Sequence, residues 1–121
     1  MLVVDDDASI RLLCRINLEL EGWSVREAST LAEARDQLAD GAVAAVLLDV
    51  HVGTDSGLAF LEELRSERPG TPVAMLTGSA DMPEVEAVAA DVVIAKPFTL
   101  DELTATVRTL VEGPRIESPP S

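Results

Sequence analysis

The sequence has few aromatic residues, a single cysteine and a single lysine. Its aromatic side chains are Trp23, Phe60 and Phe98, so a folded core must be built mainly from aliphatic side chains. Cys14 has no partner for an internal disulfide, which is typical of a protein from a reducing compartment. The 9 basic residues are outnumbered by 22 acidic ones, and the net charge of −13 disfavours unaided binding to nucleic acids or to anionic membranes.

Long hydrophobic runs are also lacking. No apolar stretch reaches the roughly 18 residues that a membrane-spanning helix needs, and nothing near the first residue resembles a secretory signal peptide. We therefore expect a cytoplasmic protein that makes no membrane contact. The length of 121 residues and the hydrophobic content of 47% instead fit one globular domain with its own core.

Short apolar runs alternate with amphipathic segments along the chain. This pattern predicts strands at residues 2–4, 24–28, 43–49, 73–76 and 92–95, and helices at residues 8–21, 31–41, 57–68, 83–89 and 100–112. Four apolar residues of the first helix recur near helical spacing: Ile10, Leu13, Ile16 and Leu20. Thr30 and Thr99 are each followed three residues later by a glutamate, which is typical of a helix capping box.

The alternation predicts an α/β fold with a five-stranded parallel sheet and helices on both faces. Five strand–helix units in this length favour the flavodoxin-like doubly wound order 2-1-3-4-5 over a barrel, which needs about 250 residues. We expect residues 1–112 to form this single domain. Residues 113–121 contain three of the seven prolines and no periodicity, so we expect a proline-rich tail or linker there.

Polar side chains stand at the ends of four of the five predicted strands. Asp5 and Asp6 follow the first strand, Asp49 ends the third, Thr77 follows the fourth and Lys96 follows the fifth. In a doubly wound sheet, ligands bind at the carboxyl ends of the strands, and the first and third strands flank the topological switch point. We therefore expect Asp5, Asp6 and Asp49 to lie together.

Three neighbouring carboxylates need a counterion or a shared proton, because two of them about 4 Å apart repel by roughly 4 kcal/mol at an effective dielectric constant near 20. Oxygen ligands suit a hard cation such as Mg²⁺. Asp49 could then accept a phosphoryl group as a carboxylate nucleophile, with Lys96 and Thr77 contacting the phosphoryl oxygens. Each residue alone also has an ordinary structural explanation, as does Asp7, which we expect to cap the first helix. The combination is what predicts phosphoryl chemistry.

Together these segments resemble the receiver domains of two-component response regulators. The matching pieces are LVVDDD at residues 2–7, VLLDV at 46–50, Gly57 eight positions after Asp49, VAMLTG at 73–78 and AKPF at 95–98. Their order and spacing match over nearly the whole chain, from residue 2 to about residue 111. The resemblance implies a signalling domain that acts through protein contacts and is not a turnover enzyme.

For the site, the resemblance implies that Asp49 is the phosphoacceptor and that Asp5 and Asp6 are the acidic Mg²⁺ pair. The backbone carbonyl of His51 would complete the metal ligands. The phosphoryl donor would be a phosphohistidine on a sensor histidine kinase or phosphotransfer protein, or a small acyl phosphate. Phosphorylation would shift the face built from the fourth helix, fifth strand and fifth helix, through which a homodimer can also form. No direct contact with nucleic acid is expected of this domain.

The chain also departs from the family pattern at several positions. Thr77 matches the switch hydroxyl and Lys96 the phosphate-contacting lysine, but Val93 stands where an aromatic residue is usual. Only nineteen positions separate Thr77 from Lys96, which predicts a short fourth helix. Gly53 stands where a proline is common, so we expect a more flexible loop after Asp49. These departures predict intact chemistry with an atypical readout.

Two other functions compete with phosphorylation-dependent signalling. The first is a constitutive protein-interaction module with a vestigial acidic pocket, as Val93 and the short fourth helix suggest. The second is a phosphatase with Asp49 as its transient nucleophile, although haloacid-dehalogenase-like phosphatases have a second aspartate where this chain has His51. A flavin-binding protein of flavodoxin type fits less well, because three aspartates would stand where its phosphate loop must accept an anion.

Overall fold

A computed structural model describes residues 1–41, 43–78 and 91–112. In order, its elements are β1 (Leu2–Val4), α1 (Ala8–Leu20), β2 (Arg26–Ala28), α2 (Leu31–Asp40), β3 (Val46–Asp49), β4 (His51–Val52), β5 (Asp55–Ser56), α3 (Gly57–Glu67), β6 (Val73–Thr77), β7 (Val92–Ala95) and α5 (Leu100–Glu112). The helix predicted at residues 83–89 and the tail predicted at residues 113–121 lie outside the described residues. Within those residues, no helix has both the length and the apolar character that crossing a membrane requires.

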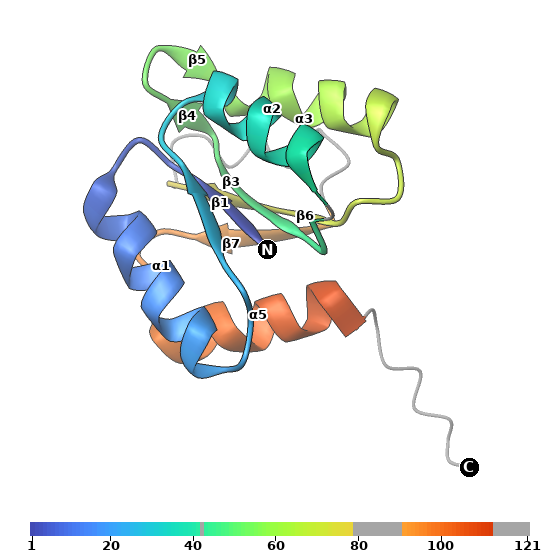
Figure 1. Ribbon diagram of the computed structural model, residues 1–121. Helices are drawn as coiled ribbons and strands as arrows, with labels where there is room; N and C mark the ends of the chain where they lie inside the picture. Colours follow the sequence, from blue (N-terminus) through green and yellow to red (C-terminus); the bar gives the residue numbers. More distant parts are fainter. Residues whose placement is uncertain (42, 79–90, 113–121) are drawn as a thin grey trace.

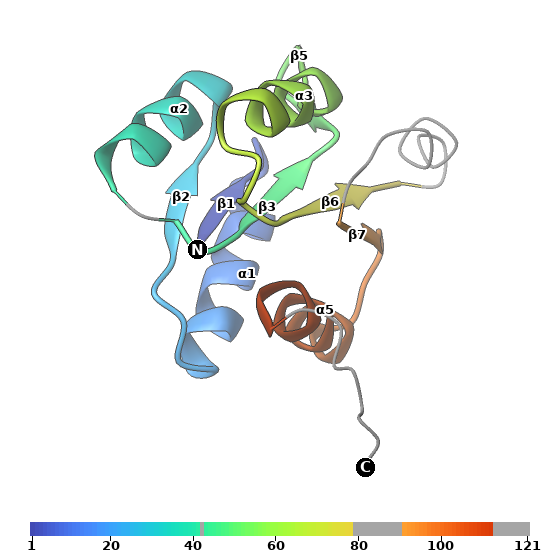
Figure 2. The ribbon, with the colours of Figure 1, turned by 90° about the vertical axis from the view of Figure 1, so that its right-hand side faces the viewer.

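Five strands form a parallel sheet in the order β2-β1-β3-β6-β7. With the small β4–β5 hairpin set aside, this is the predicted doubly wound order 2-1-3-4-5. β1 lies between β2 and β3, so that Val3 stands opposite Glu27 on one side and Leu47 on the other. Figures 1 and 2 show α2 and α3 on one face of the sheet and α1 and α5 on the other. The predicted fold is therefore confirmed.

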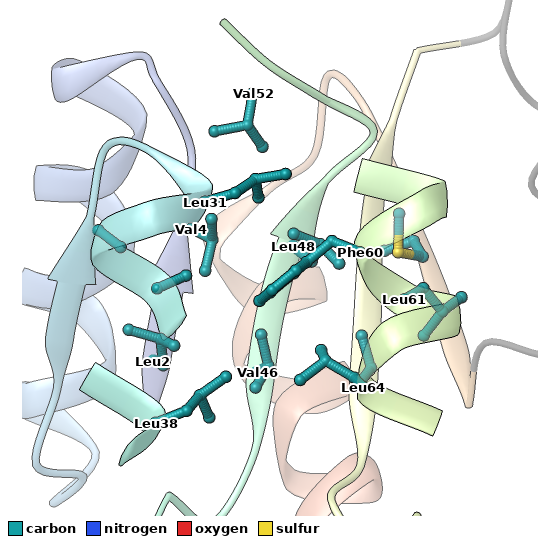
Figure 3. Packing of buried hydrophobic residues seen from close by; sticks show 14 of the residues in the cluster. Leu2, Val4, Leu31, Leu38, Val46, Leu48, Val52, Phe60, Leu61 and Leu64 are labelled. Carbon is teal, nitrogen blue, oxygen red and sulfur yellow. The ribbon is translucent and has the colours of Figure 1, made fainter. Parts of the chain in front are cut away.

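Alternate residues of the central strands supply two hydrophobic cores, one on each face of the sheet. Leu2 and Val4 pack with residues of α2 and α3, whereas Val3 packs with residues of α1 and α5. Figure 3 shows the first core, in which side chains from β1, β3, α2 and α3 face one another around Phe60. Most of the core is aliphatic, as the composition predicts, and each fully buried leucine contributes about 1.5–3 kcal/mol.

The predicted capping box at Thr99 is present, whereas at Thr30 the hydroxyl caps the helix but the glutamate bonds the residue before the cap. Thr99 Oγ1 accepts a hydrogen bond from the Glu102 amide at 3.0 Å, and the Glu102 carboxylate accepts one from the Thr99 amide at 2.7 Å. Thr30 Oγ1 likewise accepts from the Glu33 amide at 3.1 Å, while the Glu33 carboxylate reaches the amide of Ser29 at 2.7 Å. The two threonine hydroxyls satisfy amide groups that the first turn of a helix leaves without intrahelical partners.

The periodic apolar residues of α1 lie mostly on its surface. The side chains that α1 buries are Cys14 and Leu18. Leu13, Ile16 and Leu20 follow the same helical period but are 43%, 46% and 78% exposed. The spacing predicted a helix correctly. It did not identify the face that packs on the sheet, because α1 carries apolar side chains on two of its sides.

Residues 51–56 were expected to form a loop and instead form an antiparallel hairpin. His51 pairs with Ser56, and Val52 pairs with Asp55. Gly53 has a φ of 65° at the first position of the connecting turn, which is typical of two-residue hairpin turns of type II′. The side chain of Val52 is buried and joins the core beneath α2 and α3. The greater flexibility expected for this segment stays a prediction.

Candidate functional site

Three aspartates meet at the carboxyl edge of the sheet. Asp5 and Asp6 follow β1, and Asp49 ends the neighbouring strand β3. Each offers one carboxylate oxygen, and the three oxygens lie within 4.8 Å of one another. In Figure 1 the start of α1 and the β4–β5 hairpin lie at this same end of the sheet. The parallel topology thus brings together the three side chains that the sequence pattern placed at this edge.

Asp5 is the buried member of the cluster. Its side chain is 0% exposed, its Oδ1 accepts a hydrogen bond from the Asp7 amide at 2.9 Å, and its Oδ2 lies 3.4 Å from Lys96 Nζ. Burial raises the pKa of the Asp5 carboxyl, and the charge of Asp49 raises it further, while the Asp7 amide and Lys96 oppose this shift. The fold therefore keeps a carboxylate away from water and beside a like charge.

Lys96 bridges two of the aspartates. Its Nζ lies 3.1 Å from Asp49 Oδ1 and 3.4 Å from Asp5 Oδ2. Partial burial alone would lower the pKa of the Lys96 ammonium, but the two carboxylates outweigh this effect and raise the pKa. Lys96 is consequently charged at neutral pH and balances part of the negative charge of the cluster.

Thr77 ends β6 at the same edge and is 1% exposed. Its Oγ1 donates a hydrogen bond to the Gly78 carbonyl at 3.0 Å, and its own carbonyl accepts one from the Lys96 amide at 2.7 Å. Because β6 is the neighbour of β3, the hydroxyl stands one strand away from Asp49. The Gly78 carbonyl is its acceptor in this structure.

Two further residues belong to the edges of the site. Asp7 accepts hydrogen bonds from the amides of Ser9 and Ile10, so it caps α1 as predicted. His51 begins β4 two positions after Asp49, and its side chain is exposed. A role for the His51 carbonyl as a metal ligand stays a prediction.

Gly57 touches the backbone of the strand that carries Asp49. Its amide donates a hydrogen bond to the Val50 carbonyl at 2.6 Å. A Cβ atom added at Gly57 would overlap the Asp49 carbonyl oxygen, at a separation that no real Cβ adopts. The sequence marks Gly57 only by its spacing from Asp49, whereas the close approach of the two backbones explains why glycine is needed.

Arg11 is a neighbour of the site that the sequence did not predict. Its Nη1 donates a hydrogen bond to the backbone carbonyl of Asp5 at 2.7 Å, and its Nε donates one to Glu27 Oε1 at 3.2 Å. Glu27 lies in β2, beside β1. No spacing rule predicts this contact, because it depends on which strand lies next to β1.

The donor set fits a hard divalent cation. Carboxylate oxygens at short mutual distances are the ligands that Mg²⁺ takes in proteins, usually together with water and phosphate oxygens. One ammonium does not balance three carboxylates, and a cation held by Asp5, Asp6 and Asp49 would offset the remainder. A carboxylate nucleophile beside positive charge is an arrangement suited to phosphoryl transfer.

Comparison with known families matches residues 1–108 to the response regulator receiver domain. Among curated proteins, the transcriptional regulatory protein YkoG of Bacillus subtilis is 35% identical over 111 residues, and the response regulator MprA of Mycobacterium sp. strain KMS is 37% identical over 123 residues. These alignments cover 89% and 94% of this chain but only 49% and 54% of the relatives. The chain thus spans about half the length of the curated relatives it matches.

Solved structures agree with this similarity. The receiver domain of NtrX from Brucella abortus has a TM-score of 0.87 and 33% identity, with 93% of this chain and 98% of that chain covered. The response regulator TrrA from Thermotoga maritima, solved in complex with Mg²⁺ and BeF, has a TM-score of 0.82 and 33% identity. That alignment covers 90% of this chain and 96% of the other.

Proposed function

This chain belongs to the family of response regulator receiver domains of two-component signalling, and from that premise we propose that it signals by accepting a phosphoryl group on Asp49. One observation carries the proposal. The Asp49 carboxylate lies with those of Asp5 and Asp6 at the carboxyl edge of the sheet, and Lys96 Nζ lies 3.1 Å from its Oδ1.

The proposed step is transfer from a phosphohistidine, or from a small acyl phosphate, to Asp49. A carboxylate oxygen of Asp49 attacks the phosphorus, the bond from phosphorus to the donor nitrogen or oxygen breaks, and its electron pair stays with the donor. Lys96 neutralises negative charge on the phosphoryl oxygens. The Thr77 hydroxyl exchanges the Gly78 carbonyl for one of these oxygens.

Asp5, Asp6 and Asp49, with the backbone carbonyl of His51, would hold Mg²⁺. When bound, the ion supplies further positive charge to the phosphoryl oxygens, where charge develops during the transfer. The donor protein would be a sensor histidine kinase or a phosphotransfer protein. Hydrolysis of the aspartyl phosphate would return the domain to its starting state. We propose that this phosphoryl group serves as a signal carried by the domain itself, and that the domain is not a turnover enzyme on an external substrate.

Phosphorylation would change protein contacts on the face that includes β7 and α5. The acyl phosphate carries about −1.5 to −2 charges at the strand edge, in place of the single negative charge of the Asp49 carboxylate. The described part of this face has a surface hollow of about 450 Å³ whose lining includes Val93, Phe98 and Glu102, and the Val93 side chain is 37% exposed. We propose that a partner or a second copy binds here, with residues 1–112 forming the domain and residues 113–121 a tail or linker.

Labelling by acetyl phosphate tests this proposal. The wild-type chain should gain the mass of one phosphoryl group when Mg²⁺ is present and none in EDTA. Asp49→Asn should abolish labelling, while Asp55→Asn should label like the wild type, because Asp55 is an exposed hairpin residue outside the cluster. Equal labelling of the wild type and Asp49→Asn would contradict the proposal. Failure of the wild type, with a known receiver labelled in parallel, would favour the constitutive interaction module.

A further inference from the structure

The backbone of Asp5 is held at both of its polar groups by two consecutive residues of β2. Its amide donates a hydrogen bond to the Ala28 carbonyl at 3.1 Å. Its carbonyl accepts one from Arg11 Nη1 at 2.7 Å, and Arg11 in turn donates from Nε to Glu27 Oε1 at 3.2 Å. β2 therefore fixes one group directly and the other through Arg11.

Glu27 uses its two oxygens for two different arginines. Oε1 pairs with Arg11, and Oε2 lies 2.6 Å from Arg15 Nη1. The Arg11 side chain is 16% exposed, whereas the Arg15 side chain is 41% exposed. A covered guanidinium with a fixed carboxylate partner has little freedom to rotate, so Arg11 presents Nη1 to the Asp5 carbonyl in one orientation. Arg15 has the same charge as Arg11 and also pairs with Glu27, but its second partner is Glu19, farther along the helix.

The connection from β1 to α1 needs such a restraint because of the charges that it carries. Asp5 and Asp6 lie on this short connection and face the carboxylate of Asp49, so mutual repulsion pushes the connection away from the site. Asp7 anchors the far end of the connection by capping α1. Arg11 anchors the near end, at the residue where β1 has just ended.

We propose that Arg11, oriented by Glu27, is a positioning residue that holds Asp5 and Asp6 in the geometry that binds a divalent cation. The inference rests on the function proposed above, because it assigns a supporting residue to the same metal site. Partners that orient the ligands of a metal typically affect its affinity by about 10–100-fold.

The sign of the effect separates positioning from simple electrostatics. If Arg11 acted only through its charge, removing that charge would make the site more negative and would strengthen cation binding. If Arg11 positions the connection, its removal weakens cation binding in spite of the more negative site. Arg15 is the matched control, because Arg15→Ala removes the same charge from the same helix and the same Glu27 but breaks no bond to Asp5.

The test is calorimetric titration of the metal-free chain with Mg²⁺, with thermal unfolding in EDTA to establish that each variant is folded. We expect Arg11→Ala to bind Mg²⁺ about 10-fold more weakly than the wild type, and Arg15→Ala to bind as tightly as the wild type or more tightly. Arg11→Lys keeps the charge but cannot donate to Asp5 and Glu27 in the same fork geometry, so its affinity should also fall. If Arg11→Ala does not fold, the Mg²⁺ affinity of Arg11→Lys is the test of the positioning role.

The inference is overturned if Arg11→Ala binds Mg²⁺ as tightly as the wild type or more tightly. If Arg11→Ala does not fold, the same result for Arg11→Lys overturns it. Equal losses of Mg²⁺ affinity in Arg11→Ala and Arg15→Ala would also overturn it. If the wild type binds Mg²⁺ and is labelled by acetyl phosphate, those results leave the proposed function intact. If the wild type itself binds no Mg²⁺, the proposed function fails and this inference fails with it.

Discussion

The carboxylate of Asp5 lies in an environment that is unfavourable for a charge. The side chain is fully buried, and the nearby Asp49 carboxylate adds repulsion that Lys96 and the Asp7 amide offset only in part. Burial and like charge together raise the pKa of the Asp5 carboxyl, which means that the charged form is destabilised in the folded state. A site of this kind lowers the free energy of unfolding of the metal-free protein, and the same uncompensated negative charge favours a cation.

Asp5→Asn should therefore stabilise the metal-free protein. We expect its free energy of unfolding at pH 7 in EDTA to rise by about 1 kcal/mol or more, because the variant removes a buried charge that faces a like charge. Thermal unfolding in EDTA measures this effect. Asp55→Asn is the control and should stay within about 0.5 kcal/mol of the wild type, since Asp55 is exposed. A less stable Asp5→Asn would mean that its hydrogen bonds matter more than its charge.

Because of Cys14, the free energy of unfolding should depend on pH in the alkaline range. Burial raises the pKa of its thiol from 9.0 to about 11, the charge of Asp5 adds to this shift, and Lys96 opposes it. Because the folded state binds the thiol proton more tightly, this contribution is fully present below about pH 9 and is lost as the pH rises toward 11. A shift of this size corresponds to about 3 kcal/mol.

Urea unfolding between pH 8 and 11.5 measures the Cys14 contribution. The stability difference between the wild type and Cys14→Ala should shrink by up to about 3 kcal/mol over this range, because the variant lacks the thiol. Lys96 titrates in both proteins, so of its effects only its interaction with the Cys14 thiol remains in the comparison. Parallel pH profiles for the two proteins would show that the thiol keeps an ordinary pKa.

At the scale of elements, the start of α3 depends on the absence of a side chain at Gly57. Gly57→Ala places a Cβ against the Asp49 carbonyl oxygen, so the helix or the end of β3 must shift. We expect a loss of about 1–3 kcal/mol in the free energy of unfolding, together with weaker Mg²⁺ binding as Asp49 is displaced. Gly70→Ala is the control, because an added Cβ there meets nothing within 4 Å. Equal stability of the two variants would refute the close approach.

The two apolar sides of α1 should respond differently to truncation. Leu18→Ala empties part of the core and should cost about 2–5 kcal/mol, whereas Leu20→Ala should change stability by less than about 0.5 kcal/mol. Denaturant unfolding of both variants measures the difference. Similar costs for the two would mean that Leu20 is covered in solution.

The limits of prediction at this scale have physical causes. The strand order and the helix caps at Thr30 and Thr99 were predictable, because alternation and capping are local patterns. The buried face of α1 was not, since Leu18 and Leu20 are equally apolar and only the packing distinguishes them. The β4–β5 hairpin was missed because two-residue strands are too short for any periodicity.

The same distinction applies to the site. Asp5, Asp49 and Lys96 could be placed together from the sequence, because parallel strands bring their carboxyl ends to one edge. The acceptor of the Thr77 hydroxyl and the contact of Arg11 with the Asp5 carbonyl could not, because both depend on side-chain geometry that follows from the assembled fold.

For the whole molecule, the net charge of −13 is not spread evenly. Part of it is gathered at one edge of the sheet, where a single lysine balances it incompletely. The rest keeps the surface negative, which disfavours polyanions as direct partners of this domain. Under the proposed function, this edge binds the cation and other surfaces of the domain contact protein partners.

The position of the phosphoryl group tests the central claim most directly. After treatment with acetyl phosphate and Mg²⁺, borohydride reduction converts an aspartyl phosphate into homoserine, which peptide fragmentation then locates in the sequence. We predict one modified residue, Asp49, and none when EDTA replaces Mg²⁺. Modification of Asp5, Asp6 or His51 in place of Asp49, or labelling that is independent of the metal, would contradict Asp49 as the phosphoacceptor of a metal-dependent site.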